Sequence, residues 1–176
     1  LGLQSPEEYI TYIDSHLKDE SDVLVSLITT HHTFFFREYS HFEYLKEVLP
    51  ELVKGVKDRG ETCLKVWSAA CSRGQEAYSL SMFLDYYLPR IDKSITYSIF
   101  GSDIDVDSVK VAQNGVYHRR EIKSVPMNYL GSHWARGTGE IADFVKAKKS
   151  ISENCSFKPL NLMDFSSEMR GEMFDI

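Results

Sequence analysis

The sequence has little of what a secreted, membrane-spanning or nucleic-acid-binding protein needs. Its three cysteines, Cys63, Cys71 and Cys155, are an odd number without Cys-x-x-Cys spacing. No disulfide framework or zinc site is therefore predicted, and reduced thiols in the cytoplasm are expected. No apolar run reaches the roughly 18 residues of a transmembrane helix, and the N-terminal segment lacks the basic and apolar regions of a signal peptide. Positive charge is also in deficit. The 20 Lys and Arg against 26 Asp and Glu give a net charge of −6, which argues against nucleic-acid and membrane partners.

The chain does contain enough apolar residues for a folded core. Its 176 residues correspond to one domain and a remainder. Hydrophobic residues make up 43% and charged residues 26% of the sequence, which is ordinary for a globular domain and excludes disordered and low-complexity classes. We find no internal repeat, and we expect a monomer.

The N-terminal third has helical patterns. Ser5–Glu8 reads Ser-Pro-Glu-Glu, which predicts a helix start with a Ser cap and Pro at the first helical position. The apolar stretch Val23–Ile28 predicts another short helix. Ser40–Glu43 forms a second capping box, and the helix that it begins is expected to end or kink at Pro50 and to close near Gly60.

The remainder alternates between strand and helix patterns, which predicts an α/β fold with a parallel sheet and helical crossovers. Residues 116–155 are the least regular part and are locally basic. The end of the chain resembles the first residues of a buried strand, so we expect the chain to continue beyond it. Strands are predicted over 63–68, 96–101, 157–162 and from 174 onward, and helices over 75–88 and 106–114.

The segment WSAACSRGQEAYS joins the first of these strands to its helix. Its small residues would let a ligand approach the backbone at the carboxyl end of a strand. Gly74 is its one glycine, so a pyrophosphate cradle of the GxGxxG type is a poor match. Glu76 would repel a phosphate and would suit an ammonium group or a ribose hydroxyl. A tight turn with a helix-capping Glu is an equally good local interpretation.

Two further strand ends carry polar residues. Asp103 is predicted to accept the hydroxyls of a ribose, and Asp105 to cap the next helix. At the third strand end, Asn161 could meet the edge of an adenine and Leu162 its face. Asn is also common in such turns for structural reasons, and the residues by themselves favour that interpretation.

The Phe-rich loop of residues 29–38, TTHHTFFFRE, contains Thr33 and Arg37. Arg presents a planar guanidinium that is suited to binding a carboxylate. The local sequence fits equally well an Arg that lies on the surface over packed Phe rings and has no binding role. His31 and His32 have no third ligand at a suitable spacing, so no metal site is predicted. Cys71 has no base at a suggestive spacing and is interpreted as a small buried residue.

Together these segments resemble the CheR-type chemotaxis methyltransferases. The resemblance covers about residues 25–176 and depends on four segments in order. These are TTHHTFFFRE, WSAACSRGQEAYS, GSDID followed by NGVY, and FKPLNLMDF. It implies a Rossmann-like class I methyltransferase sheet that uses S-adenosylmethionine to methylate glutamates of chemotaxis receptors. It also implies the C-terminal part of a helical domain over 1–30, linking segments over 31–60 and an incomplete cofactor-binding α/β domain over 61–176.

The resemblance further implies cofactor contacts from seven residues, and we add the hypothesis that Arg37 is catalytic because it orients a carboxylate beside the methyl group. Gln75 and Ala77 stand where the family usually has Glu and Pro, and His31 where Asn is usual. The family's small β-subdomain and a segment beside the methyl group are expected beyond the chain's end. The implied cofactor contacts are His31, Thr33, Arg37, Glu76, Asp103, Asn161 and Leu162.

Two other functions remain open at this point. A catalytically silent domain could keep the cofactor fold as a sensor or scaffold. A nicotinamide-dependent oxidoreductase would share the sheet, but the missing GxGxxG and the presence of Glu76 argue against it.

Overall fold

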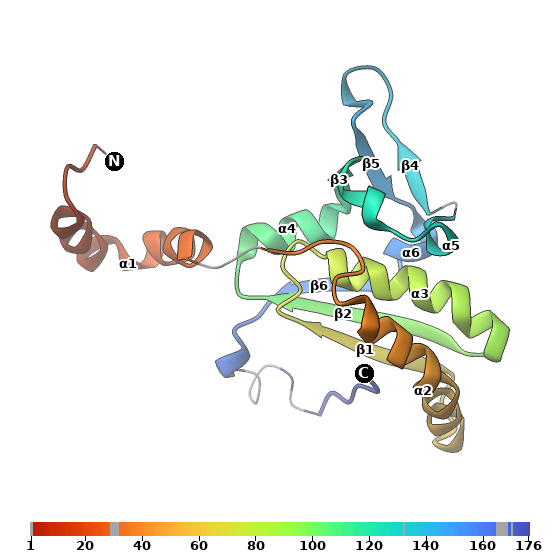
Figure 1. Cartoon of the computed structure of the whole chain (residues 1–176). Helices are drawn as coiled ribbons and strands as arrows, with labels where there is room; N and C mark the ends of the chain where they lie inside the picture. The colour runs from red at the N-terminus through yellow and green to blue at the C-terminus, as the bar shows by residue number, and fades with distance from the viewer. Residues whose placement is uncertain (1, 29–31, 132, 165–168, 170) are drawn as a thin grey trace.

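A computed structural model describes residues 2–28, 32–131, 133–164, 169 and 171–176. Its centre is a parallel three-stranded sheet in the order β1-β2-β6 (Figure 1). Strand β1 spans Cys63–Ala69, β2 spans Thr96–Asp103 and β6 spans Cys155–Pro159. The predicted α/β architecture is confirmed, and its strands are as expected except that β6 begins and ends earlier than predicted.

Helices cover one face of this sheet (Figure 1). They are α2 (Tyr39–Asp58), α3 (Gln75–Ile91) and α4 (Val106–Asn114). Alternate residues of β1 and β2 point toward them and are buried, as period-2 strands require. Because both crossovers place their helix on the same face, the opposite face of the sheet keeps half-exposed side chains such as Trp67 and Phe100.

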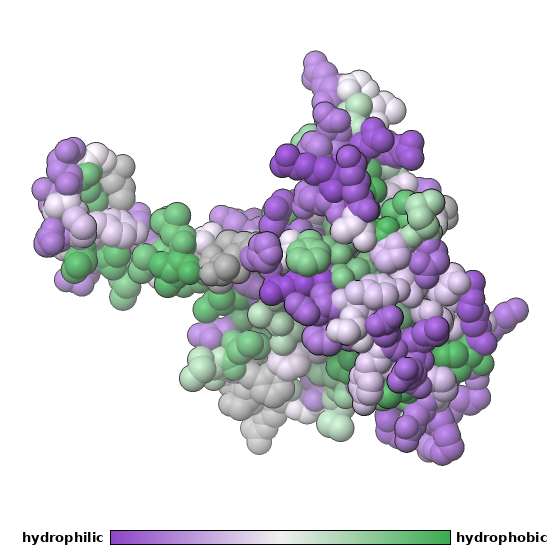
Figure 2. Space-filling view, in the orientation of Figure 1, coloured by the Kyte–Doolittle hydropathy of each residue, from purple (hydrophilic) through white to green (hydrophobic). Residues whose placement is uncertain are grey.

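Helix α1 (Pro6–Ile28) projects from the body of the molecule, which it approaches at α4 (Figure 1). Its predicted Ser cap is confirmed, because the Glu8 amide donates to Ser5 Oγ at 3.3 Å. The Glu8 carboxylate accepts the Gln4 amide at 2.8 Å, and not the Ser5 amide of a capping box. A kink at His16 divides the helix, so the second helical part begins earlier than the predicted Val23. Figure 2 shows apolar side chains gathered on this arm, and Leu27 and Ile28 are exposed.

Two helix predictions near α2 are wrong. The helix begins at Tyr39 and not after Ser40, and Glu38, which precedes it, forms no side-chain cap. Pro50 lies inside α2, so the helix does not end there, whereas its last residue, Asp58, agrees with the predicted close near Gly60. Proline removes one backbone donor, but burial of the apolar face on both sides of it, including Leu49 and Val53, outweighs that loss.

A second sheet replaces the irregular segment that we expected between β2 and β6. It is antiparallel with the order β3-β5-β4, formed by Val116–His118, Phe144–Ala147 and Trp134–Arg136. The chain therefore contains a small antiparallel sheet that the sequence patterns did not predict. Strands of three or four residues are too short to show a period in the sequence. Short helical segments complete this region: η1 (Glu121–Ser124), α5 (Met127–Leu130), η2 (Gly139–Ile141) and α6 (Lys149–Ser152).

The end of the chain lies beside β1. No strand is assigned there, so the predicted fourth strand is not formed as such, but the Asp175 amide donates to Lys65 O at 2.8 Å and the Trp67 amide to Ile176 O at 2.9 Å. These bonds lie on the edge of β1 opposite β2. From β1 the chain continues to β2 and β6 on one side, and its end then returns to the other side of β1. The strand order therefore reverses at β1, so the carboxyl end of β1 is a topological switch point. Open α/β sheets bind their ligands at such points. No helix among the described residues is long and apolar enough to cross a membrane.

Candidate functional site

The turn between β1 and α3 has an unusual backbone. Ala70 and Ser72 have φ values of 57° and 49°, and Gly74 has 88°. A Cβ on Gly74 would lie 2.8 Å from the Cβ of Ala112, so only glycine allows this close packing on α4. Non-glycine residues in this conformation cost about 1–3 kcal/mol each and gather at functional sites. All four such residues in the described chain lie in this turn and in the loop before α2.

Asp103 ties this turn to the end of β2. Its side chain is 6% exposed. Oδ2 accepts the Ser72 amide at 2.7 Å, and Oδ1 accepts the Asp105 amide at 2.9 Å. Each carboxylate oxygen can accept a second hydrogen bond, so the group retains capacity for ligand hydroxyls. Asp105 Oδ2 accepts the Ser108 amide at 3.0 Å, which confirms its predicted role as the cap of α4.

Glu76 lies in the first turn of α3, where the helix dipole favours a carboxylate. Its Oε1 accepts the hydroxyl of the buried Ser68 at 2.7 Å. This contact fixes the orientation of Glu76 and leaves Oε2 available. This role of Ser68 was not predicted, and the position of Ser68 at the end of β1, eight residues before Glu76, is the signal that could have identified it.

The Phe-rich loop is anchored on α3. The Phe36 amide donates to Ser79 Oγ at 2.9 Å, and the rings of Phe35 and Phe36 are buried. The anchored loop presents Arg37, whose Nη1 donates to His32 O at 2.7 Å and whose side chain is half exposed. The burial of the Phe35 and Phe36 rings explains two of the three consecutive Phe residues in this loop.

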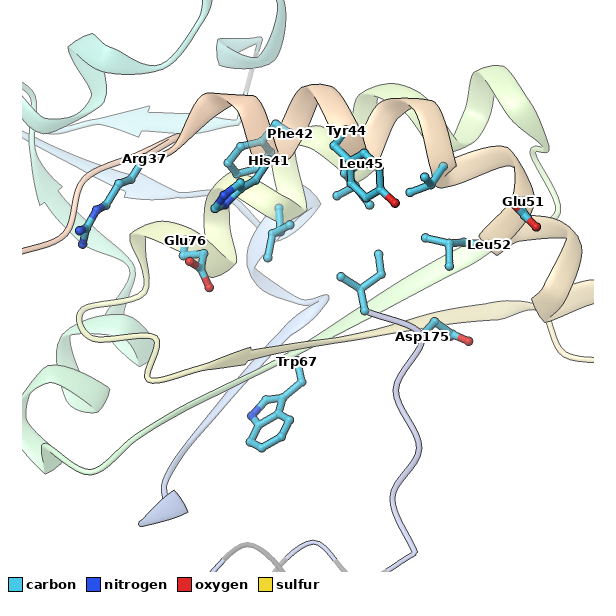
Figure 3. A pocket seen from close by; sticks show the side chains of 13 residues that line it. Arg37, His41, Phe42, Tyr44, Leu45, Glu51, Leu52, Trp67, Glu76 and Asp175 are labelled. Carbon is cyan, nitrogen blue, oxygen red and sulfur yellow. The ribbon is translucent and has the colours of Figure 1, made fainter. Parts of the chain in front are cut away.

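These segments enclose a cavity of about 140 Å³. A larger, mainly apolar groove of about 600 Å³ continues from it between α2 and β1. Both are lined by Arg37, Phe42 and Glu76. Figure 3 shows Arg37 and Glu76 at the same end of the groove, one from the loop and one from α3. The smaller cavity is lined by His32, Thr33, Phe34, Arg37, Phe42, Ala70, Cys71, Ser72 and Glu76.

The structure brings part of the predicted set together. Thr33, Arg37 and Glu76 line the smaller cavity, and Asp103 is joined to it through Ser72. His31 lies outside the described residues.

The predicted adenine contacts lie farther along the edge of the sheet. They follow β6 on the exposed 3-10 helix η3 (Leu162–Asp164), and Leu162 is 47% exposed. Asn161 Oδ1 accepts the Met163 amide at 3.0 Å, which is a structural role. Because the Leu160 amide donates to Asp103 O at 2.9 Å, these residues are nonetheless beside the end of β2.

The chemistry of the cavity favours binding over nucleophilic catalysis by the protein. Burial, assisted by the charge of Asp103, raises the pKa of Cys71 to about 12, so its thiol stays protonated at neutral pH. Two carboxylates and one guanidinium fit a nucleoside that carries an ammonium and a carboxylate group. The hydroxyl of Ser72, which lines the same cavity, is buried and has no hydrogen-bond partner among the described residues.

Comparison with known proteins identifies the family to which the chain belongs. Residues 31–176 match the family model described as CheR methyltransferase, SAM binding domain. The chain is 30% identical over 165 residues to a chemotaxis protein methyltransferase of Borreliella burgdorferi, covering 93% of this chain and 57% of the relative. The corresponding protein of Escherichia coli is 32% identical over 164 residues, with 93% and 54% covered. Chemotaxis protein methyltransferase 2 of Pseudomonas aeruginosa is 30% identical over 173 residues, with 98% and 59% covered. The chain thus spans a little more than half the length of these relatives.

Proposed function

Because the chain belongs to the CheR methyltransferase family and carries its S-adenosylmethionine-binding domain, we propose that this protein methylates glutamate side chains of chemotaxis receptors. The relatives are named chemotaxis protein methyltransferases, which supports the reaction class. The glutamate substrate and the receptor partner are the finer part of the proposal.

One observation supports the proposal most strongly. A cavity at the carboxyl end of β1 has the anion Glu76 and the cation Arg37 on its lining, and the buried carboxylate of Asp103 is joined to it through Ser72. In this arrangement Glu76 would hold the ammonium group of S-adenosylmethionine and Asp103 its ribose hydroxyls. His31, Thr33, Asn161 and Leu162 are proposed as further contacts on the resemblance to the family.

The reaction requires no general base from the chain. S-adenosylmethionine supplies a methyl group on a positively charged sulfur. A glutamate carboxyl has a pKa of about 4.3 and is ionised at neutral pH, so its oxygen can form the new bond to the methyl carbon while the sulfur takes the electron pair of the broken bond. Because opposite charges cancel, exclusion of water and correct alignment supply most of the rate enhancement.

Arg37 is the residue that we place closest to this chemistry. It lines both the small cavity and the groove, so its guanidinium can orient a carboxylate, of the substrate or of the cofactor, at the junction of the two. Its contact with His32 O uses Nη1 and leaves other donors of the fork available.

The test combines binding with turnover in the full-length protein. Calorimetric titration with S-adenosylhomocysteine measures binding, and transfer of a radioactive methyl group to receptor cytoplasmic fragments measures catalysis. We expect base-labile methyl esters on glutamates, and we expect Arg37→Ala to lower turnover about tenfold or more. Tight binding without methyl transfer would instead support a silent scaffold, and unchanged turnover in Arg37→Ala would remove its catalytic role.

A further inference from the structure

The hydroxyl of Ser72 is a buried polar atom that the fold does not use. Ser72 Oγ has no hydrogen-bond partner among the described residues. Two other buried side-chain atoms share this property, on Gln75 and Trp134. Ser72 differs from both because it lines the small cavity together with Arg37 and Glu76.

The backbone at this position gives an independent argument. Ser72 has a φ of 49°, a conformation that glycine adopts more easily than serine. Polar residues that tolerate it often do so by a local hydrogen bond of the side chain, and Ser72 Oγ makes none. The fold itself would therefore be as stable, or more stable, with glycine at this position. A serine adds only its unused hydroxyl.

The neighbouring contact places Ser72 beside Asp103. The amide of Ser72 donates to Asp103 Oδ2 at 2.7 Å, so the backbone donor is already used while the side-chain donor and acceptor remain free. The hydroxyl therefore lies on the residue that joins the cavity to the carboxylate assigned to the ribose. A hydroxyl can both donate and accept, which matches the polar oxygen atoms of a ribose.

We propose that Ser72 is a further cofactor-binding residue whose hydroxyl hydrogen-bonds the ribose side of S-adenosylmethionine. The assignment rests on the proposed function for its cofactor. It gives Ser72 two separate tasks, because the amide holds Asp103 in place and the hydroxyl contacts the ligand.

The experiment is calorimetric titration of the full-length protein with S-adenosylhomocysteine, using wild type, Ser72→Ala and Ser72→Gly. Both variants retain the backbone amide and remove the hydroxyl, and glycine also relieves the backbone strain. We expect each to raise the dissociation constant about tenfold, as loss of one hydrogen bond predicts. The thermal midpoint of the ligand-free variants should equal or exceed that of wild type, because no protein contact is lost.

A second ligand locates the contact on the cofactor. 5′-Methylthioadenosine retains the ribose and lacks the amino-acid group, so both ligands should lose affinity by the same factor. A loss seen with S-adenosylhomocysteine alone would overturn the placement beside the ribose. The matched control is Ser98→Ala, an exposed serine on β2, which should bind both ligands as wild type does.

The outcomes separate the two proposals. Wild-type binding with unchanged affinity in both Ser72 variants overturns the role of the hydroxyl and leaves the proposed function intact. Absence of binding to wild type contradicts the cofactor assignment and the role of Ser72 together.

Discussion

The backbone amide of Ser72 and the carboxylate of Asp103 meet at 2.7 Å, and this contact joins the turn after β1 to the end of β2. Asp103 accepts a second amide, that of Asp105. The carboxylate is thus oriented by the backbone on both oxygens before any ligand arrives. Such preorganisation lowers the cost of binding.

Replacing Asp103 by Asn should weaken cofactor binding strongly. The amide nitrogen of Asn would face a backbone donor at one of the two contacts, and the charge that strengthens both hydrogen bonds would be lost. We expect the dissociation constant for S-adenosylhomocysteine to rise about 10- to 100-fold, as loss of roughly 1.5–3 kcal/mol implies. The control is Asp107→Asn, an exposed residue that pairs with Lys110. Equal affinities in the two variants would contradict the role of Asp103.

Ser68→Ala should reduce affinity for ligands that carry an ammonium group. The variant removes the hydrogen bond that orients Glu76 and leaves the Glu76 carboxylate in place. We expect binding of S-adenosylhomocysteine to weaken about 5- to 10-fold, in line with one hydrogen bond of roughly 1 kcal/mol, while 5′-methylthioadenosine is unaffected. Comparable losses for both ligands would show that Glu76 does not contact the ammonium group.

Gln75→Glu should destabilise the fold in a pH-dependent manner. The buried Gln75 amide donates to Glu121 Oε1 at 3.3 Å, and Glu121 Oε2 accepts the His118 amide. A carboxylate at position 75 would face that of Glu121, so one of the two would have a raised pKa in the folded state. The unfolding free energy should match wild type at low pH and fall short by about 1–3 kcal/mol as pH rises above about 4.3.

The double variant Gln75→Glu with Glu121→Gln tests that explanation. It restores one donor and one carboxylate in the reverse order, so urea unfolding at neutral pH should recover most of the lost stability. If the double variant is as unstable as the single one, charge repulsion is not the cause.

Gly101→Ala should be destabilising because neighbouring strands leave no room for a side chain there. A Cβ at this position would lie 2.5 Å from Cδ1 of Phe157, the residue paired with it on β6. We expect a loss of about 1–3 kcal/mol in urea unfolding, typical of an overpacked core. Adding Phe157→Leu should return part of this loss. Simple additivity of the two substitutions would argue against the clash.

The thiol of Cys71 should make the fold sensitive to alkali. Its pKa is raised to about 12 by burial, whereas the unfolded thiol titrates near pH 8.5. The folded state thus retains a proton that the unfolded state releases. The stability that the thiol contributes is complete below about pH 8.5 and is lost progressively as pH rises toward 12. Near pH 10, wild type should have lost about 1–2 kcal/mol more than Cys71→Ala, measured by urea unfolding, with Cys63→Ala as the partly exposed control.

Local patterns in the sequence were sufficient for the elements that position the site. Strand β1, helix α3 and the cap at Asp105 follow from side-chain period and capping chemistry, which act over a few residues. The parallel sheet with helical crossovers follows from the alternation of strand and helix patterns. The identity of the cofactor came from four motifs in order, and the family comparison agrees with it.

The remaining features depend on contacts between segments far apart in the chain. The small sheet depends on pairing between β3, β5 and β4. Strands of three or four residues are too short to give a recognisable alternation in the sequence, so this pairing was not predicted. Helix α2 passes through Pro50 because its apolar face is buried on both sides of the proline. The roles of Ser68 and Ser72 depend on how the turn folds back on Glu76 and Asp103. Sequence patterns thus determined the strands of the main sheet and the helices between them. Only tertiary packing determined which polar atoms are satisfied by the fold and which remain for a ligand, because a hydrogen bond depends on distance in space and not on spacing along the chain.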